Sequence, residues 1–217
     1  MDELTLLQRF AVAVLPVLFA ITVHEVAHGW AAMKLGDKTA QMLGRLTLNP
    51  VKHIDPVGTI LVPGLMLLFG GFIFGWAKPV PVTWQNLHNP KRDMALVAIA
   101  GPLSNLIMAL IWAIVMKISL VLPVELSMLV QPLLYMGGIG ITINLILLVL
   151  NLVPIPPLDG SRIVSSLLPG KWSWQYNRIE NYGLFILMAL LFTGVLQDII
   201  GPPINTFQTV IYRLLGL

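Results

Sequence analysis

The spacing of apolar residues limits what this chain can fold into. The hydrocarbon core of a bilayer requires about 20 apolar residues per spanning helix. The chain offers five such stretches with short polar connections between them, at 10–33, 57–76, 95–116, 133–152 and 182–200. Only 11% of its residues are charged, against roughly 25% in an ordinary soluble domain. We therefore expect an all-α polytopic membrane protein, with residues 1–217 forming a single integral membrane unit in contact with the lipid bilayer.

Two parts of the chain depart from a simple spanning helix. The stretch 57–76 carries Pro63 and glycines at 64, 70, 71 and 75, a density of helix breakers that a straight lipid-exposed helix rarely has. We expect this segment to be broken or re-entrant. The last stretch is expected to stop at the Gly-Pro-Pro of 201–203. The tail beyond it is too short to span, and its apolar residues recur at helical spacing, which predicts a helix lying at the membrane interface.

Charge and cysteine content exclude other classes of protein. The formal net charge is +3, but the 13 Lys and Arg residues are scattered among the loops, where they orient a membrane protein. We therefore expect no nucleic-acid partner. Cysteine is absent, so a metal site must use His, carboxylate or amide ligands.

Two histidines and a glutamate lie inside the first apolar stretch. His24, Glu25 and His28 form the pattern His-Glu-x-x-His, whose spacing of four puts both imidazoles on one helix face, where they can share a Zn²⁺ ion. Glu25 would lie beside the metal without binding it, in the position of a general base that takes a proton from the attacking water. Ionisable groups at membrane depth are costly and by default functional. The pattern therefore indicates a zinc site rather than structural histidines.

A third zinc ligand is needed, because catalytic zinc usually has three protein ligands and a water. Asp159 directly follows the fourth apolar stretch, where prolines unwind the helix and Gly160 allows a tight turn that could aim the carboxylate inward. We predict Asp159 as this ligand. Asp55 is the rival, with His53 as a candidate fourth imidazole, although capping readily explains a His-x-Asp-Pro turn that opens a segment.

These motifs together resemble the site-2 protease family of intramembrane zinc metalloproteases. The His-Glu-x-x-His at 24–28 lies in a membrane helix, and Asn-Leu-Val-Pro-Ile-Pro-Pro-Leu-Asp-Gly at 151–160 looks like the family's second motif. Segments 48–59, 74–82 and 100–105 look like the compact bacterial branch, which lacks PDZ and CBS domains. The apolar segment 57–76 is a departure, since it lies between the two motifs in addition to the family's three-helix core.

The resemblance implies a site and an activity. It implies one Zn²⁺ per chain held by His24, His28 and Asp159, catalysis by Glu25, and a role for Asn151 near the reacting carbonyl. The expected activity is zinc-dependent endopeptidase cleavage of transmembrane substrate proteins. The alternative from a different class is a divalent-cation transporter or channel that uses the same cluster, but transport seldom needs a non-ligating glutamate beside the first histidine.

A short strand-like element is expected near the active site. Residues 75–82 alternate in a strand-like way and could pair with an unwound substrate by strand addition. The predicted substrate-binding residues are Gly75, Trp76, Lys78, Pro79 and Val80. The competing interpretation is a Pro-rich connector.

The two motifs can share a metal only if the chain makes an even number of crossings between them. This requires segment 57–76 to return to the side from which it entered. With that topology, ten Lys and Arg residues lie on the active-site side and three, at positions 9, 117 and 213, on the other. Positive residues favour the cytoplasmic side. We therefore expect an integral protein of the bacterial cytoplasmic membrane with its active site toward the cytoplasm.

Overall fold

The computed structural model describes residues 5–62, 64–65, 75 and 77–217. Short helical turns at Pro50–His53, Pro56–Leu61, Trp84–Asn86 and Val124–Leu126 connect longer helices. The α-helices are α1 (Leu6–Lys34), α2 (Thr39–Met42), α4 (Pro90–Val121), α5 (Ser127–Leu152), α6 (Asp159–Leu167), α7 (Gly170–Asn177), α8 (Glu180–Phe192) and α9 (Val195–Leu215). The described residues contain no β-strand. The expected all-α fold class is confirmed, while the strand-like element is an irregular stretch.

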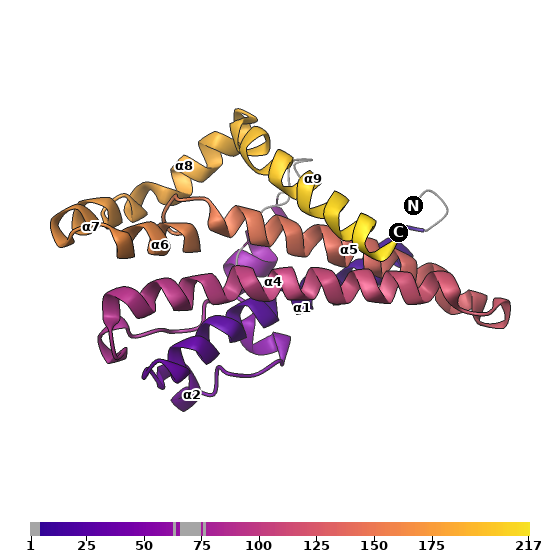
Figure 1. The fold of residues 1–217 in the computed structure, drawn as a ribbon, viewed down its shortest axis with the longest axis horizontal. Helices are drawn as coiled ribbons and strands as arrows, with labels where there is room; N and C mark the ends of the chain where they lie inside the picture. The colour runs from indigo at the N-terminus through magenta and orange to yellow at the C-terminus, as the bar shows by residue number, and fades with distance from the viewer. Residues whose placement is uncertain (1–4, 63, 66–74, 76) are drawn as a thin grey trace.

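Among the described residues, three single helices are long and apolar enough to cross a membrane, and they form the centre of the molecule. Their candidate spans are Phe10–Lys34 in α1, Pro90–Val121 in α4 and Met128–Leu152 in α5. Figure 1 shows α4 and α5 side by side along the length of the molecule, and α1 packs against both. The first, third and fourth apolar stretches of the sequence are thus confirmed as helices of spanning length.

Helix α4 has the two faces expected of a helix packed within a membrane bundle. Its inner face is lined by small buried residues, among them Ala98, Gly101, Ala109 and Ala113. Its outer face exposes large aliphatic side chains at helical spacing, namely Leu96, Leu103, Ile107, Leu110, Ile111, Ile114 and Ile118. Small residues let helices approach closely, and large apolar residues suit contact with lipid. The bundle is therefore held by close helix contact inside and presents hydrocarbon outside.

The carboxyl-terminal helices differ from the sequence expectation. The chain breaks at Gly194, between α8 and α9, and the two helices meet at 79°, the inverted V above α5 in Figure 1. Gly194 has a φ of +80°, a left-handed conformation that glycine adopts without a Cβ clash. Pro202 and Pro203 lie inside α9, so the expected stop at 201–203 is wrong. Each proline removes one backbone donor, and the packing of α9 on α5 keeps the helix continuous across them.

The tail expected as a separate interfacial helix is the second half of α9. Ile211 is only 3% exposed and belongs to the core cluster that includes Trp112 of α4 and Leu145 of α5. Lys117 Nζ donates a hydrogen bond of 2.8 Å to the carbonyl of Gly216. The tail is helical as predicted. Ile204, Ile211 and Leu215 of its apolar side pack on the bundle, while Phe207, Val210 and Leu214 are exposed.

The expected break in segment 57–76 falls largely on residues 63, 66–74 and 76, which lie outside the described residues. The segments on either side of it meet at one end of the bundle. The His88 N–H donates to the Leu35 carbonyl at 2.9 Å, and the Thr83 N–H donates to Asp37 Oδ2 at 2.7 Å. The end of α1 and the approach to α4 therefore lie together, as the requirement for an even number of crossings demands.

Cysteine labelling tests this topology on a chain that has no native cysteine. Single cysteines at Lys38 and Gln85 should react with an impermeant maleimide from the same side of a sealed vesicle, because both positions flank the Asp37–Thr83 hydrogen bond. A cysteine at Glu125, in the turn between α4 and α5, should react from the opposite side. Labelling of positions 38 and 85 from opposite faces would show that the intervening segment makes a net crossing.

Candidate metal centre

Three potential metal ligands meet where α1, α4 and α6 come together. His24 and His28 lie one turn apart on α1, and their Nε2 atoms are 3.0 Å from each other. Asp159 Oδ2 lies 3.3 Å from His24 Nε2 and 3.2 Å from His28 Nε2. These residues are the one group of three or more His, Asp or Glu side chains in the described part of the chain that could hold a metal ion.

The hydrogen bonds behind the two imidazoles determine which ring nitrogen of each carries the proton. His24 Nδ1 lies 2.6 Å from Asn105 Oδ1, and His28 Nδ1 lies 2.8 Å from the carbonyl of Val97. Both partners on α4 are acceptors, so each Nδ1 must be the donor. Each Nε2 therefore presents a lone pair to the centre of the cluster.

This arrangement fits a bound cation. Asp159 Oδ2 is buried and has no hydrogen-bond donor among the described residues. Two imidazole lone pairs and a carboxylate oxygen thus converge without a hydrogen between them, and a positive ion relieves that repulsion. Two His nitrogens and one Asp oxygen are also an ordinary donor set for catalytic zinc. His24, His28 and Asp159 are therefore the residues that would hold the metal.

Gly101 of α4 allows the two imidazoles to approach that helix closely. A Cβ added at Gly101 would overlap His28 Nε2 and would lie 2.6 Å from His24 Cε1. Even alanine at this position would push the imidazoles away from α4. The Ala-Gly-Pro sequence of α4 thus provides the surface on which the histidine pair rests.

Asp159 reaches the site because α6 begins immediately beside the end of α5. The chain leaves α5 after Leu152, turns through a proline-rich segment and starts α6 at Asp159. A Cβ at Gly160 would overlap the Leu152 carbonyl and lie 2.6 Å from the Val153 oxygen, so only glycine permits this close approach. The carboxylate in the first turn of α6 is also favoured by the partial positive charge of the helix amino terminus.

Glu25 points toward the irregular segment 77–83 rather than toward a basic side chain. Its Oε2 accepts a hydrogen bond of 2.7 Å from the Val80 N–H. Val80 is buried, and a Cβ at Gly29 would lie 2.7 Å from Val80 Cγ1, so Gly29 makes room for Val80 beside α1. The segment predicted to bind substrate therefore lies directly beside the predicted general base.

Side chains from the loop after α1 hold segment 77–88 in this position. The Arg45 guanidinium donates to the Lys78 carbonyl at 2.9 Å. The buried Asp37 accepts from the Thr83 and Thr39 N–H groups, from the Thr39 hydroxyl and from the Asn86 amide. Burial raises the pKa of Asp37, but the hydrogen bonds from Thr39, Asn86 and Thr83 outweigh burial and hold that pKa below its ordinary value. An ionised Asp37 thus anchors the segment that contacts Glu25.

The other predicted substrate-binding residues occupy the exposed part of the same segment. Gly75, Lys78 and Pro79 are exposed, while Trp76 lies outside the described residues. The Lys78 N–H donates to the His53 carbonyl at 2.9 Å. The segment is thus tied to neighbouring loops through its backbone.

Asn151 lies in the last turn of α5, eight residues before Asp159 in the sequence. Its Nδ2 donates to the Leu147 carbonyl at 3.0 Å. Within the described residues it forms no hydrogen bond with Glu25 or with the His-His-Asp cluster. One amide N–H of its side chain remains without a described partner.

The rival ligands Asp55 and His53 do not join the cluster. Asp55 Oδ1 accepts from the N–H groups of Val57 and Gly58 at 3.0 and 2.7 Å, which is the capping role that competed with metal binding in the sequence analysis. His53 is buried, and its Nε2 contacts the Thr47 carbonyl at 2.9 Å. Both residues thus support the loop that precedes segment 57–76.

Sequence reasoning missed several residues that shape the site. The contacts of Asn105 and Gly101 with the histidines were not foreseen from the sequence. Asp37 and Arg45 were not singled out at all. A polar amide inside an apolar helix was the available signal for Asn105, but its partner on α1 depends on how the helices align.

Comparison with known proteins agrees with the chemistry of this donor set. The family model for peptidase family M50 matches residues 123–194. The chain belongs to peptidase family M50, the site-2 protease family of zinc metalloproteases. The family and the zinc cofactor expected from the sequence motifs are thus confirmed.

Individual relatives cover most of the chain. It is 39% identical to the putative zinc metalloprotease YwhC of Bacillus subtilis over 202 residues, which is 93% of this chain and 89% of that protein. It is 29% identical to the putative zinc metalloprotease Rip2 of Mycolicibacterium smegmatis over 181 residues, or 83% of this chain and 66% of that protein. No solved structure matches the chain.

Replacement of Gly101 by alanine should displace the histidine pair and reduce zinc binding. The added methyl would overlap His28 Nε2, so we expect the zinc content of the purified protein to fall well below that of the wild type while its helix content is unchanged. Gly138→Ala on α5 is the matched control, because a Cβ there meets no atom within 4 Å. Metal analysis and circular dichroism make the comparison, and full zinc content in Gly101→Ala would refute the steric argument.

Proposed function

We propose that this chain is an intramembrane endopeptidase that hydrolyses peptide bonds of transmembrane proteins at the His24–His28–Asp159 centre. The observation that carries the proposal is the convergence of these ligand atoms beside Glu25, on a helix long and apolar enough to span a membrane. Residues 1–217 form a single integral membrane unit in this proposal. No feature of the described residues favours the divalent-cation transporter considered above.

Glu25 is the general base of the proposed reaction. Zinc at this centre supplies Lewis-acid activation of a water molecule, as in other zinc hydrolases. Glu25 takes the proton of the attacking water and delivers it to the departing amine. The Val80 N–H donates a hydrogen bond to Oε2 and holds the carboxylate in one orientation. Oε1 is then the oxygen that accepts the proton and passes it on.

Asn151 stabilises the reacting carbonyl in the proposed mechanism. One hydrogen of its amide is used by the Leu147 carbonyl, which fixes the side chain against α5. The other amide hydrogen is available to a substrate oxygen, whose negative charge grows as water adds to the carbonyl. The expected effect is a faster chemical step rather than tighter substrate binding.

Segment 75–82 is the proposed contact for an unwound substrate. Substrate pairing has to use backbone groups that the protein leaves free, because Val80 N–H is bound to Glu25 and prolines at 79 and 81 have no N–H. The Val80 carbonyl and the Val82 N–H make no hydrogen bond within the described residues. We propose that the substrate backbone pairs with these two groups, beside the exposed Lys78 and Pro79.

The active site is proposed to face the cytoplasm of a bacterial cell. The end of α1 and the approach to α4 lie at one end of the bundle, which is the topology that gives the ten-to-three division of basic residues. Positive residues concentrate in cytoplasmic loops. A transmembrane substrate would then be cut near the cytoplasmic side of the bilayer.

Replacement of Glu25 by glutamine should abolish cleavage of a model transmembrane substrate while zinc content stays at about one per chain. The amide has nearly the shape of the carboxylate, but it cannot accept the proton. Asp159→Ala and His24→Ala are the comparison variants, and both should lose zinc. Cleavage by Glu25→Gln at the wild-type rate would end the general-base assignment, and zinc retained in His24→Ala would end the metal-site assignment.

Replacement of Asn151 by alanine should lower turnover by roughly 10²-fold, the usual cost of losing one donor to a developing oxyanion. Zinc content and substrate KM should change little, because the interaction belongs to the transition state. Steady-state cleavage kinetics measure both constants. An unchanged kcat would assign Asn151 to packing against Leu147 alone.

A further inference from the structure

Two asparagines form a buried polar pair inside the membrane-spanning bundle. Asn105 of α4 and Asn144 of α5 are both 0% exposed. On α5, Ile141, three residues before Asn144, and Leu145, directly after it, are equally buried. Amide groups at this depth need protein partners for all their hydrogen-bonding atoms. The hydrogen-bond partners of the two asparagines fix the orientation of both side-chain amides.

The hydrogen bonds around the pair allow only one orientation of each amide. Asn144 Nδ2 donates to the Gly140 carbonyl at 2.8 Å, so Asn144 Oδ1 faces α4. Asn105 Nδ2 donates to Asn144 Oδ1 at 2.9 Å and to the Ala20 carbonyl at 3.2 Å. Both N–H groups of the Asn105 amide are therefore used by atoms that can only accept. Rotating the Asn105 amide by 180° would place its oxygen against the Ala20 carbonyl.

The orientation of Asn105 decides the tautomer of His24. With its amide nitrogen committed, Asn105 can present only Oδ1 to His24 Nδ1, at 2.6 Å. His24 must then carry its proton on Nδ1 and keep the lone pair of Nε2 toward Asp159. In the alternative tautomer the proton is on Nε2. A lone pair of His24 Nδ1 would then face a lone pair of Asn105 Oδ1 in a buried site.

We propose that Asn105 and Asn144 are positioning residues that hold His24 in the tautomer able to bind zinc. The proposal rests on the proposed function of the His24–His28–Asp159 centre. It gives α5, a helix that contributes no metal ligand, a part in orienting one of the ligands. Second partners of ligating histidines commonly fix the ring and its tautomer, and here the fixing group is itself fixed by a second amide.

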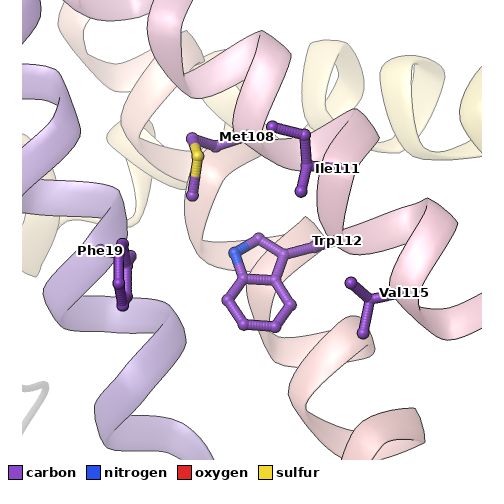
Figure 2. A pocket seen from close by; sticks show the side chains of 5 residues that line it. All are labelled: Phe19, Met108, Ile111, Trp112 and Val115. Carbon is purple, nitrogen blue, oxygen red and sulfur yellow. The ribbon is translucent and has the colours of Figure 1, made fainter.

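A tight contact between α4 and α5 keeps the two amides within reach. Trp112 lies two turns after Asn105 on α4, and Gly140 lies one turn before Asn144 on α5. A Cβ at Gly140 would lie 2.5 Å from Trp112 Cδ2, so the indole packs directly on the α5 backbone. Figure 2 shows Trp112 beside the apolar hollow that it lines with Phe19, Met108, Ile111 and Val115.

The test measures zinc affinity of the purified full-length chain in detergent, by competition with a chromophoric chelator. Asn105→Leu removes the acceptor of His24 Nδ1 and should weaken zinc binding by about 10- to 100-fold, the usual range for such partners. Asn144→Leu keeps the size of the side chain but removes the acceptor that orients Asn105. We expect a weakening of about tenfold, at the lower end of the same range.

Asn144→Asp separates the directional role from simple packing. A carboxyl group buried among apolar residues stays neutral, so it donates O–H to the Gly140 carbonyl and accepts from Asn105, as the amide does. The zinc affinity of Asn144→Asp should therefore be within about twofold of the wild-type affinity. This difference is much smaller than the tenfold loss expected for Asn144→Leu, which corresponds to about 1.4 kcal/mol. Thr142→Val is the control, since Thr142 Oγ1 makes the same kind of bond to the Gly138 carbonyl four residues back on α5 and should not affect zinc.

Two results would overturn the proposal. The first is zinc affinity within twofold of the wild type in both Asn105→Leu and Asn144→Leu. The second is a loss of affinity in Asn144→Asp as large as in Asn144→Leu, with both proteins monodisperse and of wild-type helix content. His24→Ala is measured alongside. If it retains zinc, the metal centre itself is wrong, whereas loss of zinc in His24→Ala with full affinity in both leucine variants rejects only the positioning role.

Discussion

Polar groups buried in membrane-spanning helices need hydrogen-bond partners within the protein. Each imidazole Nδ1 is therefore matched to an acceptor on α4, namely Asn105 Oδ1 for His24 and the Val97 carbonyl for His28. The remaining lone pairs point at one another and at Asp159. The arrangement of α1 and α4 follows from this requirement, because a shift of either helix leaves a buried donor or acceptor without a partner.

Much of the fold and the composition of the site could be predicted because they depend on local patterns. The length and apolarity of residues in α1, α4 and α5 identify spanning helices, and the spacing of His24 and His28 places both on one helix face whatever surrounds them. The candidate third ligand, Asp159, followed from its place directly after the fourth apolar stretch, where prolines end the helix and Gly160 allows a tight turn. The period of a helix and the thickness of a bilayer are the same in every protein, so these features can be predicted without knowing how the helices pack.

The remainder depends on how the helices align, which no single segment specifies. Gly101 and Asn105 face the histidines only because α4 crosses α1 at that point, so their roles were not visible from the sequence. The end of the last apolar stretch was misplaced for a related reason. Pro202 and Pro203 are local signals to stop a helix, but packing of α9 on the bundle outweighs them, and Gly194 makes the break instead.

The contact between Val80 and Glu25 has a consequence for inhibitor design. Prolines on both sides of Val80 leave a single backbone donor at this point of the segment, and that donor is occupied by the carboxylate. A compound that joins a metal-binding group to a carbonyl at the right distance would take this N–H for itself and displace Glu25. Such a molecule would gain selectivity from one main-chain atom, which a side-chain substitution at position 80 cannot remove except by introducing proline.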